Sequence, residues 1–173
     1  MIDAEIEAAA RRVLDLCRAG GLTLATAESC TGGLVAGALT AIAGSSDVVD
    51  RGFVTYSNRA KTEMLGVREA ILAAYGAVSA ATALAMAKGA LAHADTGLAV
   101  AITGVAGPGG GTADKPVGLV HFACVRRDGA ARHREMRFGP LSRDAIRRQS
   151  VLTALDMLAD AASADPDPFD ADL

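Results

Sequence analysis

The chain has 173 residues, 51% of them hydrophobic, which is enough to bury the core of one ordinary domain. A net charge of −3 and an aromatic content of 3% argue against a basic or base-stacking surface, so we expect no nucleic-acid partner. The three cysteines show no CxxC spacing and no apolar run is long enough to span a membrane, so we expect no metal, no membrane partner and a cytoplasmic protein.

Helical and strand patterns alternate along most of the chain. Helices are predicted at residues 3–19, 33–43, 68–75, 80–94 and 143–161, and a further one after Asn58, which we take as its N-cap. Strands are predicted at residues 22–27, 52–57, 98–103, 117–125 and 132–138, the last two as a hairpin. The fold class is therefore α/β, with a mixed five-stranded sheet between helices. We expect one domain over residues 1–162 and a disordered acidic tail over 163–173.

Three polar or glycine-rich stretches follow the first three predicted strands. They are Thr26–Thr31, Tyr56–Lys61 and Thr103–Gly111. Because open α/β sheets bind ligands at the carboxyl ends of parallel strands, we expect these stretches to meet at one edge. Two hydroxyl residues are candidates for orienting a substrate: Thr103 at this edge, and Ser46 from the Gly44–Asp47 loop. Capping and turn hydrogen bonds explain both residues equally well.

The motif TAESCTGG places Ser29 and Cys30 where a strand turns into a helix. Ser29 is the first candidate nucleophile, with a helix cap as the alternative explanation, and Cys30 is either a competing nucleophile or a small buried hydrophobe. The free N–H groups of such a corner suit an anion or an oxyanion, which makes Thr31 and Gly32 candidate substrate contacts as well.

Lys61 is the candidate base for a serine nucleophile. None of the three histidines falls in the three stretches, which argues against a Ser–His–Asp triad. Burial, the first turn of a helix and the like charge of Arg59 would each lower the pKa of Lys61 from its ordinary value of about 10.4. The alternative is a solvated lysine. Tyr56 could hydrogen-bond to the lysine or to the substrate, or it is a half-buried strand residue.

Several stretches occur together in one order: TAESCTGG, IAGSSDVVDRGFVTYSNRAK, GVREAIL, GAVS, TGVAGPGGG, KPVG and RDAIRRQ. In this set the chain resembles the CinA C-terminal domain family over most of residues 5–158. The resemblance implies a three-layer α/β/α domain. Members of the family are commonly homo-oligomers, and we expect a homodimer. It also implies hydrolysis of the amide of nicotinamide mononucleotide (NMN) to nicotinate mononucleotide and ammonia, with no cofactor or metal.

The resemblance also assigns roles to particular residues. The family's functional positions fall on Ser29, Ser46, Tyr56, Lys61 and Thr103. Ser29 would attack the carboxamide carbon and Lys61 would take its proton, although Ser46 remains an alternative nucleophile. Tyr56 would hold Lys61 or relay the proton to the leaving ammonia, and Ser46 and Thr103 would position the nicotinamide or the ribose. Candidates for holding the substrate phosphate are the 104–111 loop, with Gly104 and Gly107, and Arg147 or Arg148. A nucleotide-binding or regulatory module without turnover is the alternative function.

Overall fold

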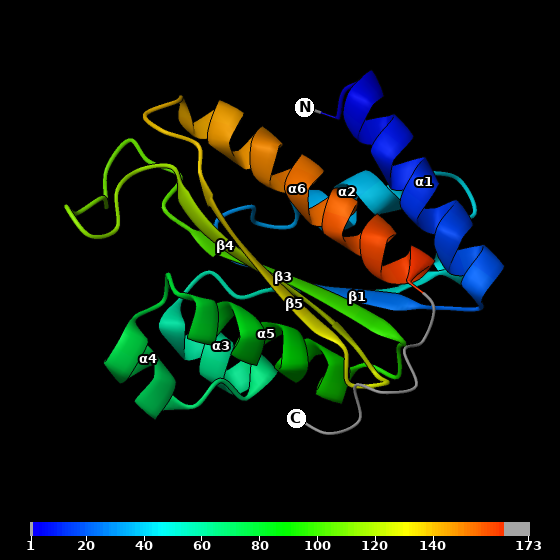
Figure 1. Ribbon diagram of the computed structural model, residues 1–173, viewed down its shortest axis with the longest axis horizontal. Coiled ribbons are helices and arrows are strands. Elements are labelled where there is room, and N and C mark those ends of the chain that lie inside the picture. The colour runs from blue at the N-terminus through cyan, green and yellow to red at the C-terminus, as the bar shows by residue number, and fades with distance from the viewer. Residues whose placement is uncertain (1, 165–173) are drawn as a thin grey trace.

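A mixed sheet of five strands, in the order β2-β1-β3-β4-β5, forms the centre of the computed structural model, which describes residues 2–164 (Figure 1). The strands are β1 (Leu24–Glu28), β2 (Val49–Val54), β3 (Leu98–Gly104), β4 (Leu119–Arg126) and β5 (Ala131–Arg137). β1 pairs in parallel with β2 and β3, whereas β4 pairs antiparallel with β3 and β5. The predicted parallel crossovers and terminal hairpin are confirmed.

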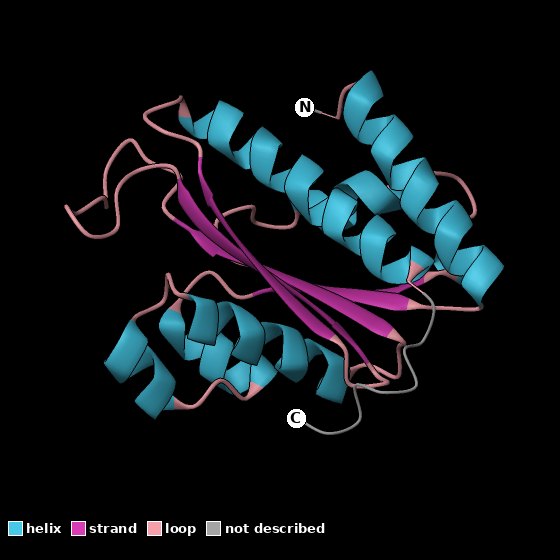
Figure 2. Ribbon diagram, in the orientation of Figure 1, coloured by secondary structure: helices cyan, strands magenta, loops and turns pink. Residues whose placement is uncertain are grey.

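Helices cover both faces of the sheet. They are α1 (Ala4–Gly20), α2 (Leu34–Thr40), α3 (Asn58–Leu65), α4 (Glu69–Tyr75), α5 (Ala80–His93) and α6 (Arg143–Ser163), with a short 3-10 helix η1 (Ser45–Asp47) before β2. Figure 2 shows the strands as a layer between two groups of helices, which Figure 1 identifies as α1, α2 and α6 on one face and α3, α4 and α5 on the other. This confirms the three-layer α/β/α fold. None of these helices is both long and apolar enough to cross a membrane.

Small side chains on one face of the sheet bring α5, and with it α3, close to the strands. Ala99, Ala101 and Ala123 are fully buried beneath α5. On the far side of α5, a Cβ at Gly89 would lie 2.0 Å from the Leu65 carbonyl oxygen, so only glycine allows this approach of α5 to the end of α3. The tight packing holds α3, which carries Lys61, over the sheet.

The structure differs from the sequence expectations at a few boundaries. β2 begins three residues before the predicted start and ends at Val54. The N-cap of α3 is Ser57, not Asn58, because the Ser57 hydroxyl accepts from the Ala60 N–H at 3.0 Å. α6 continues to Ser163, and the predicted disorder of the tail beyond Ala164 lies outside the described residues.

Candidate active site

Ser29 lies directly after β1, on the face of the sheet that α3 and α5 cover. Its N–H donates to the Ile102 carbonyl at 2.9 Å, which extends the pairing of β1 with β3 by one residue. The Gly32 N–H donates to the Ser29 carbonyl at 3.0 Å and closes a tight turn. Gly32 and Gly33 both have positive φ, so this turn depends on glycine at two consecutive positions. Ser29 is thus fixed by strand pairing on one side and by the turn on the other.

Lys61 reaches Ser29 from the first turn of α3. Its Nζ lies 3.1 Å from Ser29 Oγ and donates to the Thr55 carbonyl at 3.0 Å. The Lys61 side chain is 1% exposed, and it forms no ion pair with any residue that the structure describes. Burial therefore lowers the pKa of Lys61 below its ordinary value. An amine that loses its proton more readily next to a serine hydroxyl is the arrangement that a Ser–Lys pair requires.

Arg59 does not contribute the like charge that we expected beside Lys61. Its side chain is largely exposed and pairs with Glu63 at 2.9 Å, one turn further along α3. The depression of the Lys61 pKa has burial as its main cause, and a neighbouring cation is not needed to explain it.

Cys30 follows Ser29 and points to the opposite layer. It is 5% exposed and packs in the hydrophobic core between the sheet and α1, α2 and α6. Burial raises the pKa of its thiol to about 12, so the thiolate is scarce at neutral pH. The structure favours the small buried hydrophobe over the competing nucleophile.

Replacing Cys30 by alanine is expected to leave kcat within about tenfold of wild type, whereas loss of a nucleophile costs about 10⁴-fold or more. The measurement is ammonia release under saturating substrate. Cys124→Ala is the matched control, because Cys124 is buried in the same core cluster and its thiol pKa is likewise raised to about 12. Loss of activity in Cys30→Ala alone would support a thiol mechanism instead.

A cavity of about 300 Å³ opens beside Ser29 and Lys61, a size typical of small-molecule sites. It is lined by Ser29, Cys30, Tyr56, Asn58, Lys61, Ala77, Val78, Thr103, Gly104, Val105, Ala106, Gly107, Gly109, Gly110 and Arg143. These residues come from the carboxyl ends of β1 and β3, the β2–α3 connection and the start of α3, the α4–α5 connection, the glycine-rich loop and the start of α6. The three stretches expected at one sheet edge therefore do meet there.

Tyr56 lines the cavity but forms no hydrogen bond with Lys61. Its side chain is 62% exposed, and its hydroxyl accepts from Arg143 Nη2 at 2.8 Å. Arg143 Nη1 also donates to the Gly107 carbonyl at 2.8 Å. Arg143 thus joins Tyr56 to the glycine-rich loop at the mouth of the cavity and places a cation there.

Thr103 lies beside Ser29 in the sheet and is buried in the cavity wall. Its hydroxyl donates to the Ala77 carbonyl at 2.7 Å, which fixes the segment between α4 and α5 against the end of β3. Gly104 and Gly107 continue the wall. A Cβ would lie 2.7 Å from Val120 at Gly104, the end of β3, and 2.6 Å from Val117 at Gly107, so the chain lies close to β4 and to the residues before it because neither position carries a side chain.

Several predicted site residues lie elsewhere. Ser46 lies in η1, which leads into the start of β2 and therefore sits at the opposite edge of the sheet from Ser29. Arg147 and Arg148 are both outside the cavity, and Arg148 pairs with Asp3 and Glu5. Thr31 and Gly32 belong to the turn behind Ser29, and neither lines the cavity.

Arg143 and Asn58 line the cavity although neither was named as a candidate site residue, and Asn58 was expected there only as part of the Tyr56–Lys61 stretch. Asn58 was read only as a helix cap, and Arg143 only as the start of the last helix. The start of α6 reaches the sheet edge because Arg143 follows the Gly139–Ser142 connection from β5, whose end lies near Gly118. Among the described residues no group of three or more His, Cys, Asp or Glu side chains is placed to hold a metal ion.

Comparison with known proteins places this site in a family. A family model described as the CinA C-terminal domain matches residues 6–162. The chain belongs to the CinA C-terminal domain family. The CinA family was the one expected from the sequence motifs, and all the residues that line the cavity fall inside the matched range.

Relatives within the CinA family cover most of the chain. The nicotinamide-nucleotide amidohydrolase PncC of Escherichia coli (strain K12) is 49% identical over 158 residues, which are 91% of this chain and 95% of the relative. A CinA-like protein of Synechococcus sp. (strain RCC307) is 52% identical over 90% of this chain, which spans 37% of that relative. The crystal structure of a competence/damage-inducible protein from Agrobacterium tumefaciens matches with a TM-score of 0.92 and 56% identity, covering 95% of this chain and 99% of that one.

Proposed function

We propose that this chain hydrolyses the carboxamide of NMN to nicotinate mononucleotide and ammonia. The observation that carries the proposal is the buried contact of 3.1 Å between Lys61 Nζ and Ser29 Oγ at the wall of a ligand-sized cavity. The name of the E. coli relative, a nicotinamide-nucleotide amidohydrolase, supports the choice of substrate.

In the proposed first step, Ser29 Oγ attacks the carboxamide carbon and its proton passes to Lys61 Nζ. The negative oxygen of the tetrahedral intermediate faces the N–H of Cys30, the residue after the nucleophile, as in other serine hydrolases. Lys61 then returns the proton to the departing nitrogen, so ammonia leaves and Ser29 carries the nicotinoyl ester. Water attacks the ester carbon and gives a proton to Lys61, the bond to Ser29 Oγ breaks, and Lys61 returns the proton to Oγ as nicotinate mononucleotide is released. The steps balance with water as the sole co-reactant.

The other end of the substrate carries a phosphate, for which we propose Arg143 and the glycine-rich loop in place of Arg147 or Arg148. Arg143 and Lys61 are the basic residues of the cavity wall, and only the guanidinium stays charged while Lys61 acts as a base; a guanidinium also suits a phosphate through paired hydrogen bonds. Tyr56 is exposed beside it and offers an aromatic face to the pyridine ring. Thr103 and Gly104 would contact the substrate from the end of β3.

The test is an ammonia assay with NMN, nicotinamide and glutamine side by side. We expect kcat/KM for NMN to exceed that for either smaller amide by at least about 100-fold, because binding of the ribose phosphate contributes to transition-state stabilisation. Ser29→Ala, purified in parallel, measures contaminating amidase from the expression host. Tight NMN binding without ammonia release would favour the regulatory module, and preference for glutamine would contradict the assigned substrate.

A further inference from the structure

A buried carboxylate stands beside the nucleophile with no role in the steps above. Glu28 immediately precedes Ser29 and is 0% exposed. Its carboxylate accepts hydrogen bonds from three backbone N–H groups at the start of α2: Gly33 at 3.1 Å, Val35 at 3.1 Å and Ala36 at 2.9 Å. The anion that occupies this helix start is thus part of the chain itself, and these N–H groups are not free for a substrate.

Glu28 is an unusual way to cap a helix. A side chain at the N-cap position normally accepts these bonds, but the N-cap of α2 is Gly33, which has none. Glu28 reaches the helix from five residues earlier, and none of the ion pairs among residues 2–164 includes it. Burying an unpaired carboxylate is costly, but residue 33 itself cannot supply a side-chain cap, because its φ of 96° favours glycine. What Glu28 adds is a link between the nucleophile's own strand and the helix.

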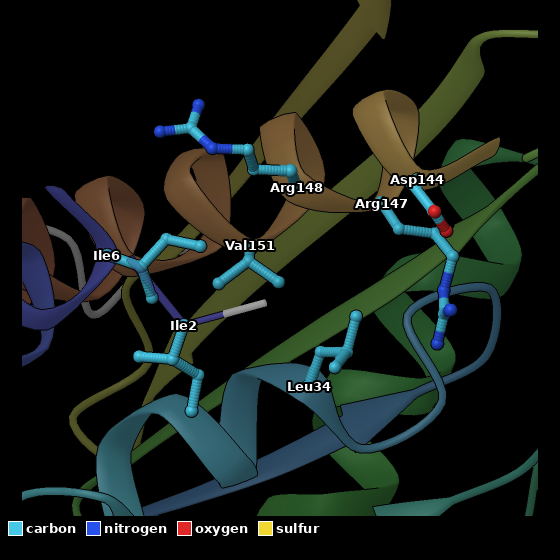
Figure 3. Close-up of a pocket in the computed structure, with 7 residues that line it drawn as sticks. All are labelled: Ile2, Ile6, Leu34, Asp144, Arg147, Arg148 and Val151. Carbon is cyan, nitrogen blue, oxygen red and sulfur yellow. The ribbon is translucent and has the colours of Figure 1, made fainter. Parts of the chain in front are cut away.

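Arg147 holds the same turn from the opposite side. From α6 its Nε donates to the Cys30 carbonyl at 3.2 Å and its Nη2 to the Thr31 carbonyl at 3.0 Å. Figure 3 shows the Arg147 side chain extending towards the loop that leads into α2, whereas Arg148 points away from it. Arg147 therefore binds the carbonyl groups of the turn, and Glu28 binds the N–H groups that follow it.

Among the described residues these contacts leave the N–H groups of Cys30 and Thr31 without a backbone or oxygen acceptor, and of the two residues Cys30 lines the cavity. The Ser29 N–H is used by Ile102 and the Gly32 N–H by the Ser29 carbonyl. In the described part of the chain the Cys30 N–H donates to no carbonyl, carboxylate or hydroxyl, and Cys30 lines the cavity. The Ser29 carbonyl, which shares a peptide plane with the Cys30 N–H, accepts from the Gly32 N–H, and Arg147 holds the carbonyl of the next peptide, so the planes on both sides of Cys30 are fixed.

We propose that Glu28 and Arg147 are positioning residues that hold the turn of residues 29–33 in its reactive geometry. They keep Ser29 Oγ within hydrogen-bond distance of Lys61 Nζ, and they keep the Cys30 N–H directed at the cavity. Neither side chain touches the substrate. The inference rests on the proposed function for its role in turnover. Its core claim, that the two side chains make Ser29 reactive, applies to any electrophile that enters the cavity.

The experiment measures the reactivity of Ser29 without NMN. A fluorophosphonate probe reacts with an activated serine, so that an Oγ–P bond forms, the P–F bond breaks, fluoride leaves and the serine proton passes to Lys61. Intact-mass measurements give the labelling rate of wild type, Glu28→Gln and Arg147→Met, with Ser29→Ala as the blank. We expect labelling to slow by on the order of 100-fold in both variants, the cost of displacing a reacting group by about 1 Å.

Turnover and stability provide the second readout. In both variants kcat for ammonia release should fall in parallel with labelling, while KM for NMN changes by less than about threefold, because the substrate contacts remain. Asp3→Asn is the matched control, since Asp3 is a carboxylate that caps α1 far from the cavity and accepts from Glu5 and Ile6 N–H groups. It should lower the melting temperature and leave labelling unchanged.

Folded variants that label at the wild-type rate and lose only thermal stability would overturn the proposal, since Glu28 would then be a structural cap. If Glu28→Gln does not fold, folded Arg147→Met decides by the same criterion. Labelling that depends on Glu28 and Arg147 in a protein that releases no ammonia from NMN would refute the proposed substrate and leave this inference standing.

Discussion

Replacing Ser29 by alanine is expected to lower kcat for ammonia release by about 10⁴-fold or more, because the group that forms the covalent intermediate is gone. The fold should survive. Ser29 contributes its backbone to the sheet and to the turn through bonds to Ile102 and Gly32, which alanine retains. Circular dichroism and the melting temperature check the fold, and the coupled assay with NMN checks the rate.

Ser46→Ala is the matched control for this variant, since Ser46 was the alternative nucleophile. Ser46 is exposed in η1, and its neighbour Asp47 is held by Arg18 at 2.8 Å, away from the cavity. Its removal should change kcat by less than about twofold, as for a surface substitution away from the site. The opposite pattern, an active Ser29→Ala and an inactive Ser46→Ala, would contradict the assignment and point to a site completed by a second copy of the chain.

Much of the candidate site was predictable because each part lies where a strand ends. Ser29 follows β1, Lys61 lies one short connection beyond β2, and Thr103 ends β3, so parallel pairing alone brings the three together. Ser46 lies away from the site because it precedes β2. A residue before a parallel strand lies at the amino-terminal edge of the sheet, opposite the edge that holds Ser29. The catalytic roles themselves stay predictions, as do the expected homodimer and the cytoplasmic location.

The contacts that shape the site were not predictable, because they join residues far apart in the sequence. Arg143 meets Tyr56 across 87 residues, and Arg147 meets Cys30 across 117. Both depend on how α6 crosses the sheet, which no local pattern specifies. Glu28 was hidden for a different reason: it sits in a strand whose other residues are apolar or small, and its partners are backbone groups, which any sequence supplies.

Replacing Lys61 by methionine or by arginine is expected to reduce kcat by at least about 10³-fold, within the range found when a general base or its partner is removed. Arginine is the sharper test. It keeps a long cationic side chain, but it stays protonated at every pH at which the protein is folded and cannot accept the serine proton. Lys88→Met, which removes an exposed lysine from α5, is the control and should leave kcat unchanged. An active Lys61→Arg enzyme would exclude Lys61 as the base.

The pH dependence of wild type separates a base from a lysine that merely supports the fold. Because burial lowers the pKa of Lys61, kcat/KM should rise with pH as this amine loses its proton and level off below the ordinary lysine value of about 10.4.

The free energy of unfolding should also rise with pH over this range. The unfolded chain binds a proton at Lys61 more tightly than the folded chain does, so this lysine costs stability below its folded pKa, and that cost disappears as pH rises towards about 10.4. The difference in unfolding free energy between wild type and Lys61→Met should therefore shift in favour of wild type across that interval. If kcat/KM does not rise with pH in this range while the stability difference shifts as expected, Lys61 is a buried lysine that takes no part in proton transfer.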